Sequence, residues 1–148
     1  MNRKILFKAK RKDNGEWVEG SLISTENNSG FILQSRTKAF VPKGTNTFCS
    51  SNCYEIDPDT ICQFTGLTDK NDKKIWENDI VKCNKRTEGF ALYKVVWRKD
   101  FADFGVEPMK PKFEAKYPMG LSDGVTLHGC DYKVIGNIFD NAELLEVE

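Results

Sequence analysis

Residues 56–81, IDPDTICQFTGLTDKNDKKIWENDIV, restrict the fold more than any other part of this sequence. The run up to Leu67 favours a strand, and the polar residues after it favour a tight loop. The W-E-N-D segment before Ile80 is typical of the diverging turn through which a further strand begins in small barrels. Pro58 keeps the preceding residue out of the helical region, and Asp57 or Asp59 can accept hydrogen bonds from the amides of that turn. The stretch therefore predicts strands joined by tight turns.

Strand patterns continue on both sides of this stretch. Apolar and charged side chains alternate in residues 4–10, which predicts a half-buried strand. The dipeptide Asn14-Gly15 predicts a type I′ hairpin turn, because both residues tolerate positive φ, and residues 17–23 form the returning strand. Shorter strands are expected at 31–34, 38–41, 80–83, 91–97 and 132–139.

The C-terminal third of the chain is less regular. Residues 98–124 contain three prolines and three glycines without a clear period, so they predict a long loop. Near the C-terminus, Asp140 or Asn141 is expected to cap a single helical turn at 142–145. We expect no helix longer than two turns.

Three segments, in this order, resemble the YopX-like family of phage and prophage proteins. They are ILFKA at 5–9, the stretch at 56–81, and YKVIGNIFDN at 132–141 followed by ELL. Asp72 and Asn78 stand where the family often has glycine, and both residue types tolerate positive φ, so we expect the turns to survive. The resemblance implies a β-rich fold whose C-terminal part is similar to an SH3-like barrel. It supplies no catalytic residues.

We therefore predict a mainly β fold in two parts. An N-terminal sheet of hairpins spans 1–55, and an SH3-like barrel spans 56–148, interrupted by the long loop at 98–124. A chain of 148 residues can bury one core or two small ones that share a boundary. Exposed edge strands in both parts favour a homo-oligomer formed by sheet pairing.

The composition is typical of a soluble globular protein, with 39% hydrophobic and 30% charged residues. No apolar run approaches the roughly 20 residues that cross a bilayer, and the N-terminus lacks the apolar segment of a signal peptide. We therefore expect a cytoplasmic protein of a bacterial host cell, without a membrane partner.

The charge pattern leaves nucleic-acid binding open as an alternative. The net charge is zero, which argues against an obligate nucleic-acid binder. Cations nevertheless precede the first acid, Asp13. A solvated strand that blunts a sheet edge explains such a run more simply. The residues that would contact nucleic acid are Lys4, Lys8, Lys10, Arg11, Lys12 and Lys43.

The cysteines and the single histidine do not predict a metal or a cofactor. The five cysteines are Cys49, Cys53, Cys62, Cys83 and Cys130, an odd number that favours free thiols in a cytoplasmic protein. Only the first two have the spacing of a zinc knuckle, whereas structural zinc sites usually pair two knuckles. His128 lies two residues from Cys130, but this spacing alone does not make a nucleophilic pair.

The sequence favours binding over catalysis. Common catalytic and nucleotide-binding motifs are absent. A metal-dependent enzyme would use Asp57, Asp59 and Asp79, although Asp79 is better explained as an acceptor for backbone amides. We predict a non-enzymatic accessory or binding protein whose partner is another copy, a host protein or a phage protein.

The expected working surface consists of the barrel loops and the 98–124 segment. The loop after Leu67 either presents amides and Lys70 to a partner or only builds the turn. Trp76 is either an exposed platform or a core residue packed against Trp97 or Phe64. The candidate binding residues are Thr65, Gly66, Asp69, Lys70, Asn71, Trp76, Phe101, Phe104 and Phe113.

Overall fold

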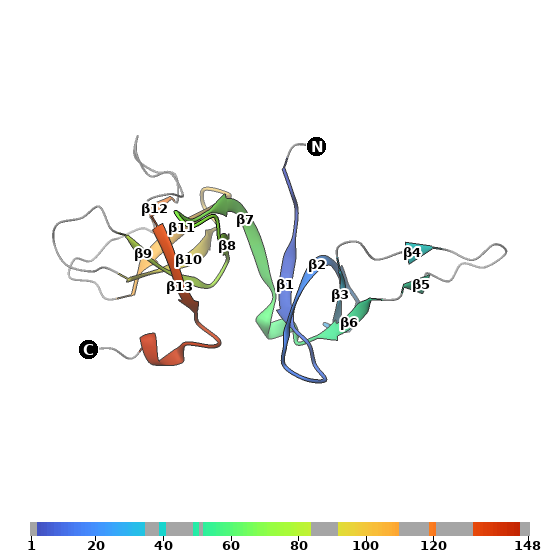
Figure 1. Ribbon diagram of the computed structural model, residues 1–148. Coiled ribbons are helices and arrows are strands. Elements are labelled where there is room, and N and C mark those ends of the chain that lie inside the picture. Colours follow the sequence, from blue (N-terminus) through green and yellow to red (C-terminus); the bar gives the residue numbers. More distant parts are fainter. Residues whose placement is uncertain are drawn as a thin grey trace. The chain divides into compact units, whose positions relative to one another are not determined.

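The structure is a computed structural model, which describes residues 3–34, 39–40, 49–50, 52–83, 92–109, 119–120 and 132–145. The chain divides into two compact units, Met1–Gln63 and Phe64–Glu148. The predicted mainly β fold is confirmed, because antiparallel sheets make up most of the described residues and the helices are single turns (Figure 1). Among the described residues, no helix is long and apolar enough to cross a membrane.

The first unit contains short antiparallel strands and one 3-10 turn. Hydrogen bonding gives the strand order β6-β3-β2-β1-β7-β8, and the chain passes into the second unit within β7. A separate pair joins β4 to β5. The elements are β1 (Phe7–Lys10), β2 (Trp17–Ser24), β3 (Gly30–Gln34), β4 (Ala39–Phe40), β5 (Cys49–Ser50), β6 (Cys53–Ile56), η1 (Pro58–Thr60) and β7 (Cys62–Thr68).

The sheet of the first unit closes on itself. An antiparallel bridge joins Arg11, just after β1, to Ile56 at the end of β6. The Asp57 amide donates to the Lys10 carbonyl at 2.8 Å, and the Lys12 amide donates to the Glu55 carbonyl at 3.0 Å. These bonds occupy one edge of β6, so β6 is a weak candidate for sheet pairing between copies. The enclosed core consists of Ala9, Val18, Ile32 and Ile56, with Phe7, Leu22, Tyr54 and Ile61 packed against it.

Gly20 allows β2 to serve both halves of this closed sheet. Residues from Trp17 to Gly20 pair with β1, and residues from Gly20 to Ser24 pair with β3. A Cβ at Gly20 would lie 1.9 Å from the carbonyl oxygen of Leu33, far inside van der Waals contact. The absence of a side chain therefore lets two strands approach at the point where β2 changes partners.

The first hairpin forms where the sequence predicts it, but the type I′ turn is wrong. The Arg11 amide donates to the Glu16 carbonyl at 2.8 Å, so four residues form the loop. Only Gly15 has positive φ, at 71°, whereas a type I′ turn requires it at both central residues. The Asn14 side chain accepts a hydrogen bond from the Glu16 amide at 2.9 Å, which favours the wider loop.

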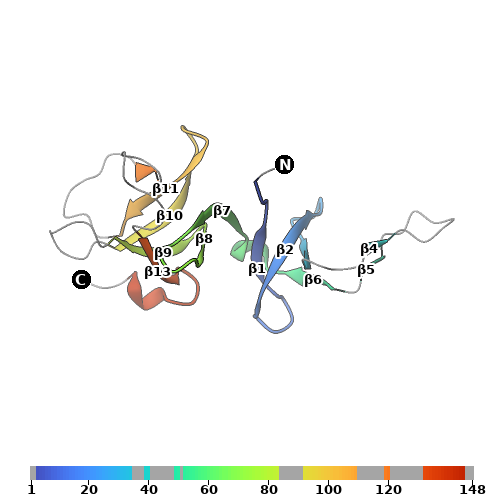
Figure 2. The ribbon, with the colours of Figure 1, turned by 45° about the horizontal axis from the view of Figure 1, so that its top comes forward.

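The second unit is built on a five-stranded antiparallel sheet in the order β12-β11-β10-β9-β13. One face of it forms the core, which consists of Ile75, Val81, Cys83, Tyr93, Val95, Val106, Tyr132 and Val134. Figure 2 shows the hairpin of β10 and β11 projecting from the rest of this sheet. The elements are β8 (Lys74–Trp76), β9 (Asp79–Cys83), β10 (Leu92–Arg98), β11 (Asp103–Pro108), β12 (Met119–Gly120), β13 (Tyr132–Asn137) and η3 (Ala142–Leu144).

The long loop predicted at 98–124 is wrong over its first part. β11 pairs with β10 from Asp103 to Pro108, and its alternate residues Phe104 and Val106 pack against the core. Gly105 and Pro108 suggested a break, but the chain stays extended because Phe104 and Val106 have apolar partners across the sheet. The SH3-like barrel stays a prediction, as does the boundary at 55/56, eight residues before the division between the two compact units.

Candidate functional site

The turn at Asp57 is held by its own polar side chains. Asp57 accepts a hydrogen bond from the Asp59 amide at 3.0 Å, as the sequence suggested. The buried Thr60 hydroxyl donates to the Asp57 carbonyl at 2.7 Å and accepts from the Lys10 amide at 2.9 Å. This turn therefore attaches η1 to the end of β1.

Asp69 links the loop between β7 and β8 to β13. Asp69 is 4% exposed. Its carboxylate accepts hydrogen bonds from the amides of Asn71 at 2.8 Å, Lys73 at 3.0 Å and Val134 at 2.9 Å. Burial raises the pKa of this carboxyl, but the bonds from the three amides outweigh burial and place the pKa below its ordinary value. Asp69 is thus a structural anion that holds two segments together.

The neighbouring loop residues are used in the same way. The Lys70 amide donates to the Tyr132 carbonyl at 3.0 Å, so with Asp69 it covers the edge of β13. The Thr65 hydroxyl donates to the Ile75 carbonyl at 2.8 Å and accepts from the Leu67 amide at 3.2 Å. These groups build the fold, which supports the simpler of the two hypotheses for this loop.

Trp76 and Asp79 form the predicted diverging turn. Trp76 is buried, and its ring lies 5.4 Å from that of Phe64, so the core interpretation holds. The Trp76 amide donates to the buried Asp79 carboxylate at 2.8 Å, which confirms Asp79 as an acceptor for a backbone amide. Among the described residues, no group of three or more histidines, cysteines or acids could hold a metal ion.

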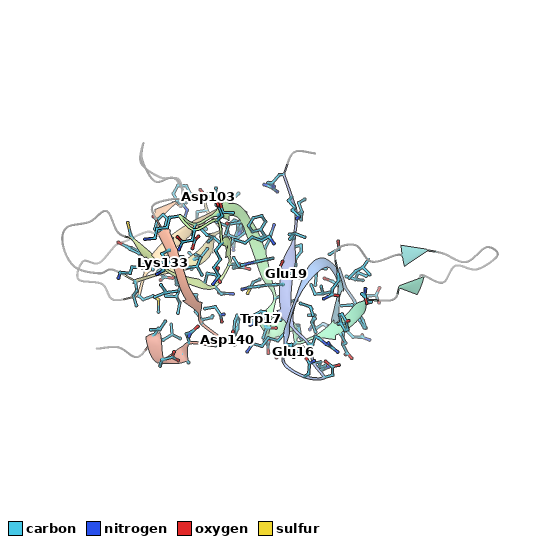
Figure 3. The ribbon with its side chains drawn as sticks, in the orientation of Figure 1. Glu16, Trp17, Glu19, Asp103, Lys133 and Asp140 are labelled. Carbon is cyan, nitrogen blue, oxygen red and sulfur yellow. The ribbon has the colours of Figure 1, made fainter. Side chains whose placement is uncertain are left out.

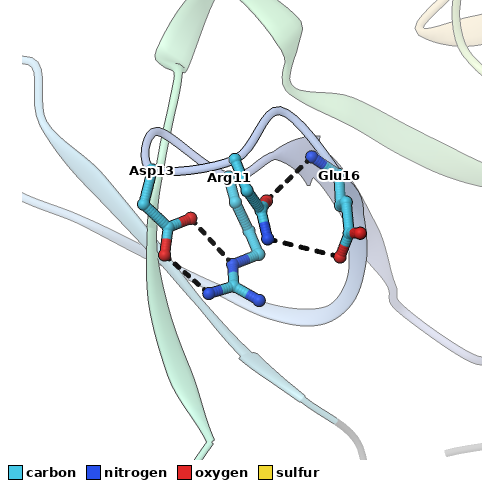
Figure 4. Close-up of polar contacts among 4 residues, drawn as sticks. Arg11, Asp13 and Glu16 are labelled. Atoms are coloured by element: carbon cyan, nitrogen blue, oxygen red, sulfur yellow. Dashed lines mark hydrogen bonds and ion pairs between the residues drawn. The ribbon is translucent and has the colours of Figure 1, made fainter.

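Two cations of the basic N-terminal strand are paired with acids. Arg11 forms a two-pronged ion pair with Asp13, at 3.0 and 2.6 Å (Figure 4). This hydrogen bond raises the pKa of Arg11 and lowers that of Asp13. Lys12 pairs with Glu55 at 3.3 Å. Both pairs reduce the charge that this strand can offer to a phosphate backbone.

The remaining members of the basic set are placed in part. Lys4 is exposed, and Lys43 lies outside the described residues. The ammonium groups of Lys8 and Lys10 lie 4.7 and 5.4 Å from the ring centroid of Trp17 on β2, and Figure 3 labels Trp17. Cation–π contacts of this kind support packing on a sheet surface.

The tip of the β10–β11 hairpin exposes aromatic side chains. Trp97 is 47% exposed and meets Phe104 edge-on, with 5.0 Å between ring centroids. Phe101 is 60% exposed and covers the guanidinium of Arg98 at 4.5 Å. Phe101 and Phe104 were candidates from the sequence, whereas Trp97 was named only as one of two possible core partners of Trp76.

The base of this tip is held by an ion pair between buried Arg98 and half-buried Asp103. Arg98 is buried and forms two hydrogen bonds with Asp103, one of them at 2.6 Å. The two residues lie opposite each other on β10 and β11. The tip therefore presents its aromatic side chains from a fixed base.

A protein-family model with the description YopX protein matches residues 6–146 of this chain. The chain belongs to the YopX family. No curated protein matches it. The chain is also similar to the crystal structure of protein EF1440 from Enterococcus faecalis, with a TM-score of 0.60 and 22% identity, covering 98% of this chain and 100% of that one. At this identity the likeness shows the fold alone.

The two departures from the usual YopX pattern keep the expected backbone. Asp72 has φ of 61° and Asn78 has φ of 67°, which confirms that both occupy positions suited to glycine. Gly66 also has positive φ, at 86°. All three positions in the 56–81 stretch thus need a residue that tolerates positive φ.

Several candidates cannot be placed in this YopX chain. Phe113, His128 and Cys130 lie outside the described residues, as does the side chain of Cys49. Cys53, Cys62 and Cys83 are free thiols, and Cys62 donates to the Thr60 carbonyl.

Replacing Ala102 by glycine is expected to stabilise the protein by about 0.5 to 1 kcal/mol. Ala102 has φ of 52° at the hairpin tip, a conformation that costs alanine more than glycine. Urea unfolding measures the change. Ala142→Gly in the exposed turn η3 is the control and is expected to lower stability instead. If the Ala102→Gly protein were less stable than the wild type, the positive φ at Ala102 would not be a source of strain.

Proposed function

We propose that this chain is a non-enzymatic accessory protein of phage or prophage origin, and that it binds protein chains through the tip of the β10–β11 hairpin. The exposure of Trp97 and Phe101 on a fixed base is the observation that carries the proposal. Tryptophan, phenylalanine and arginine are enriched at protein interfaces, and a few such residues supply most of the binding energy.

Residues of the 56–81 stretch are used to build the fold, which supports the same function. The carboxylates of Asp57, Asp69 and Asp79 all accept hydrogen bonds from backbone amides. Carboxylate oxygens that accept bonds from backbone amides hold the local turns in place. The proposal therefore assigns the 56–81 stretch to folding and the hairpin tip to binding.

The first partner in this proposal is a second copy of the chain. The hairpin exposes Trp97 beside Phe104 on the core-facing side and Phe101 over Arg98 on the other side. A twofold contact places the hairpin tip of each copy in the same interface, so Trp97 and Phe101 of both copies take part in it. Such a complex assembles within a bacterial host cell without a metal or a cofactor.

Native mass spectrometry of untagged protein at low salt tests this function. We expect a metal-free homo-oligomer, and we expect the double change Trp97→Ser with Phe101→Ser to raise its dissociation constant about 100-fold. Ile5→Ser with Leu145→Ser removes two other exposed apolar side chains and is the control. A monomeric wild type, or a double variant that assembles normally, would contradict the proposal. A stoichiometric metal ion would favour the enzymatic alternative.

A further inference from the structure

The distal part of the β10–β11 hairpin has no third strand beside it in the described part of the chain. β10 pairs with β9 as far as Lys94, and β11 pairs with β12 at Gly105 and Val106. The ribbon from 96 to 104 therefore extends beyond both neighbours, and Figure 2 shows the hairpin projecting from the sheet. A two-stranded ribbon is of marginal stability by itself. Contact with another chain would cover the part of the ribbon that the sheet leaves open.

The end of this ribbon is a tight turn with two opposite charges at its corners. The Phe101 amide donates to the Arg98 carbonyl at 3.2 Å, so Lys99 and Asp100 are the central residues of a β-turn. Both of these central side chains are exposed. Among the described residues, neither side chain makes a hydrogen bond or an ion pair, whereas Arg98 is held by Asp103. The fold therefore does not use the charges of Lys99 and Asp100.

The charges of the tip are balanced and lie in a self-complementary order. Arg98 is neutralised by Asp103, and Lys99 is followed directly by Asp100. A partner that carries one sign of charge, such as a nucleic acid or an acidic peptide, meets an attractive and a repulsive charge side by side at this tip. A second copy related by a twofold axis instead brings its own acid to the lysine and its own lysine to the acid. The charge pattern thus favours the chain itself as the occupant of the tip.

We infer that Lys99 and Asp100 set the specificity of self-association through the hairpin tip, by forming two reciprocal ion pairs between two copies. The inference rests on the proposed binding through Trp97 and Phe101 and adds the groups that recognise the partner. Phe101 follows Asp100 directly, and Trp97 lies two residues before Lys99, so the apolar and the charged contacts belong to one surface. Aromatic side chains supply most of the affinity of an interface, whereas charges at its rim exclude wrong partners and fix the orientation of the copies.

Charge reversal tests the reciprocal pairs by sedimentation equilibrium of untagged protein at low salt. Lys99→Asp places acids opposite acids across the twofold contact, and Asp100→Lys places lysines opposite lysines. We expect each variant alone to raise the dissociation constant of the homo-oligomer about tenfold, because both reciprocal pairs become repulsive. Lys4→Asp and Glu26→Lys make the same changes of charge at exposed positions of the first unit, and we expect them to leave the dissociation constant unchanged.

Combining the two reversals separates recognition from folding. A mixture of the Lys99→Asp and Asp100→Lys proteins is expected to form a mixed complex with near wild-type affinity, because the acids of one copy then face the lysines of the other. Native mass spectrometry detects this mixed complex, since the two variants differ in mass. Lys99→Asp with Asp100→Lys in one chain is expected to restore the homo-oligomer. If the mixture and the double variant assembled as weakly as the single variants, the reciprocal pairs would be wrong.

The outcomes distinguish this inference from the proposed function. A wild type that assembles, and that is weakened by Trp97→Ser with Phe101→Ser but by neither charge reversal, would overturn the reciprocal pairs and leave the proposed function standing. A monomeric wild type would overturn both.

Discussion

Asp69→Asn is expected to lower the free energy of unfolding by about 3 kcal/mol at pH 7, because it disrupts a buried anion that accepts from three backbone amides. Asparagine has one acceptor oxygen, so its NH₂ group must face either the amide of Val134 or those of Asn71 and Lys73. Because the NH₂ group and the backbone N–H are both donors, a buried polar group is then left without a hydrogen-bond partner. Urea unfolding followed by the fluorescence of the buried Trp76 measures the loss.

A matched control lies in the same loop. Asp72 is exposed at φ of 61°, a conformation that asparagine also tolerates. Asp72→Asn removes the same charge and is expected to change stability by less than about 0.5 kcal/mol. If the two variants lost equal stability, the role of Asp69 would be one of charge alone and the hydrogen bonds to β13 would be incidental.

The effect of Asp69→Asn is also expected to depend on pH. The folded pKa of Asp69 lies below its ordinary value, so the carboxylate contributes stability that is present above about pH 4. This contribution is lost as the pH falls through the folded pKa, because the proton then binds the folded state as well. The stability difference between wild type and variant is therefore expected to shrink from pH 7 to pH 3. A difference that grows on acidification would contradict the lowered pKa.

Gly20→Ala is expected to destabilise the first unit by more than about 3 kcal/mol. The new Cβ would lie 1.9 Å from the Leu33 carbonyl oxygen and 2.9 Å from the Cα of Gln34, and both are backbone atoms. Relief requires β2 and β3 to separate where they are paired, which loses hydrogen bonds on the closed sheet. Thermal unfolding followed by Trp17 fluorescence measures the effect.

Gly15→Ala separates the cost of a steric clash from the cost of an unfavourable backbone conformation. Gly15 has φ of 71°, and nothing lies within 4 Å of a Cβ built there. Alanine at this position carries only the cost of positive φ, about 1 kcal/mol. A Gly20→Ala protein as stable as the Gly15→Ala protein would show that β2 and β3 can move apart at little cost.

The local parts of this fold were open to prediction because they depend on neighbouring residues. The alternation in residues 4–10 placed β1, and the diverging turn was recognisable from Trp76 to Asp79. Asp72 and Asn78 indicated positive φ from their residue types and from the family pattern. The type I′ turn failed because the Asn14 side chain bonds to Glu16 and widens the loop. That competition depends on a side-chain rotamer, which the dipeptide does not reveal.

The candidate site was predictable only in part. Phe101 and Phe104 were named from composition, but the β10–β11 register decides that Phe104 packs against the core while Phe101 stays exposed. The same register places Arg98 opposite Asp103 and gives the tip its fixed base. None of these pairings follows from sequence distance, because pairing across a sheet depends on which strands become neighbours.

The sequence by itself determined the class of fold, the family and most of the turns, since strand periodicity and turn residues act over a few positions. Only the tertiary structure decided the partners of Asp69, whose contact with Val134 spans 65 positions, and the space that excludes a side chain at Gly20. It also decided that Lys82 and Lys133 face each other. Each of these outcomes depends on strands distant in the chain meeting in one register, and no local pattern carries that information.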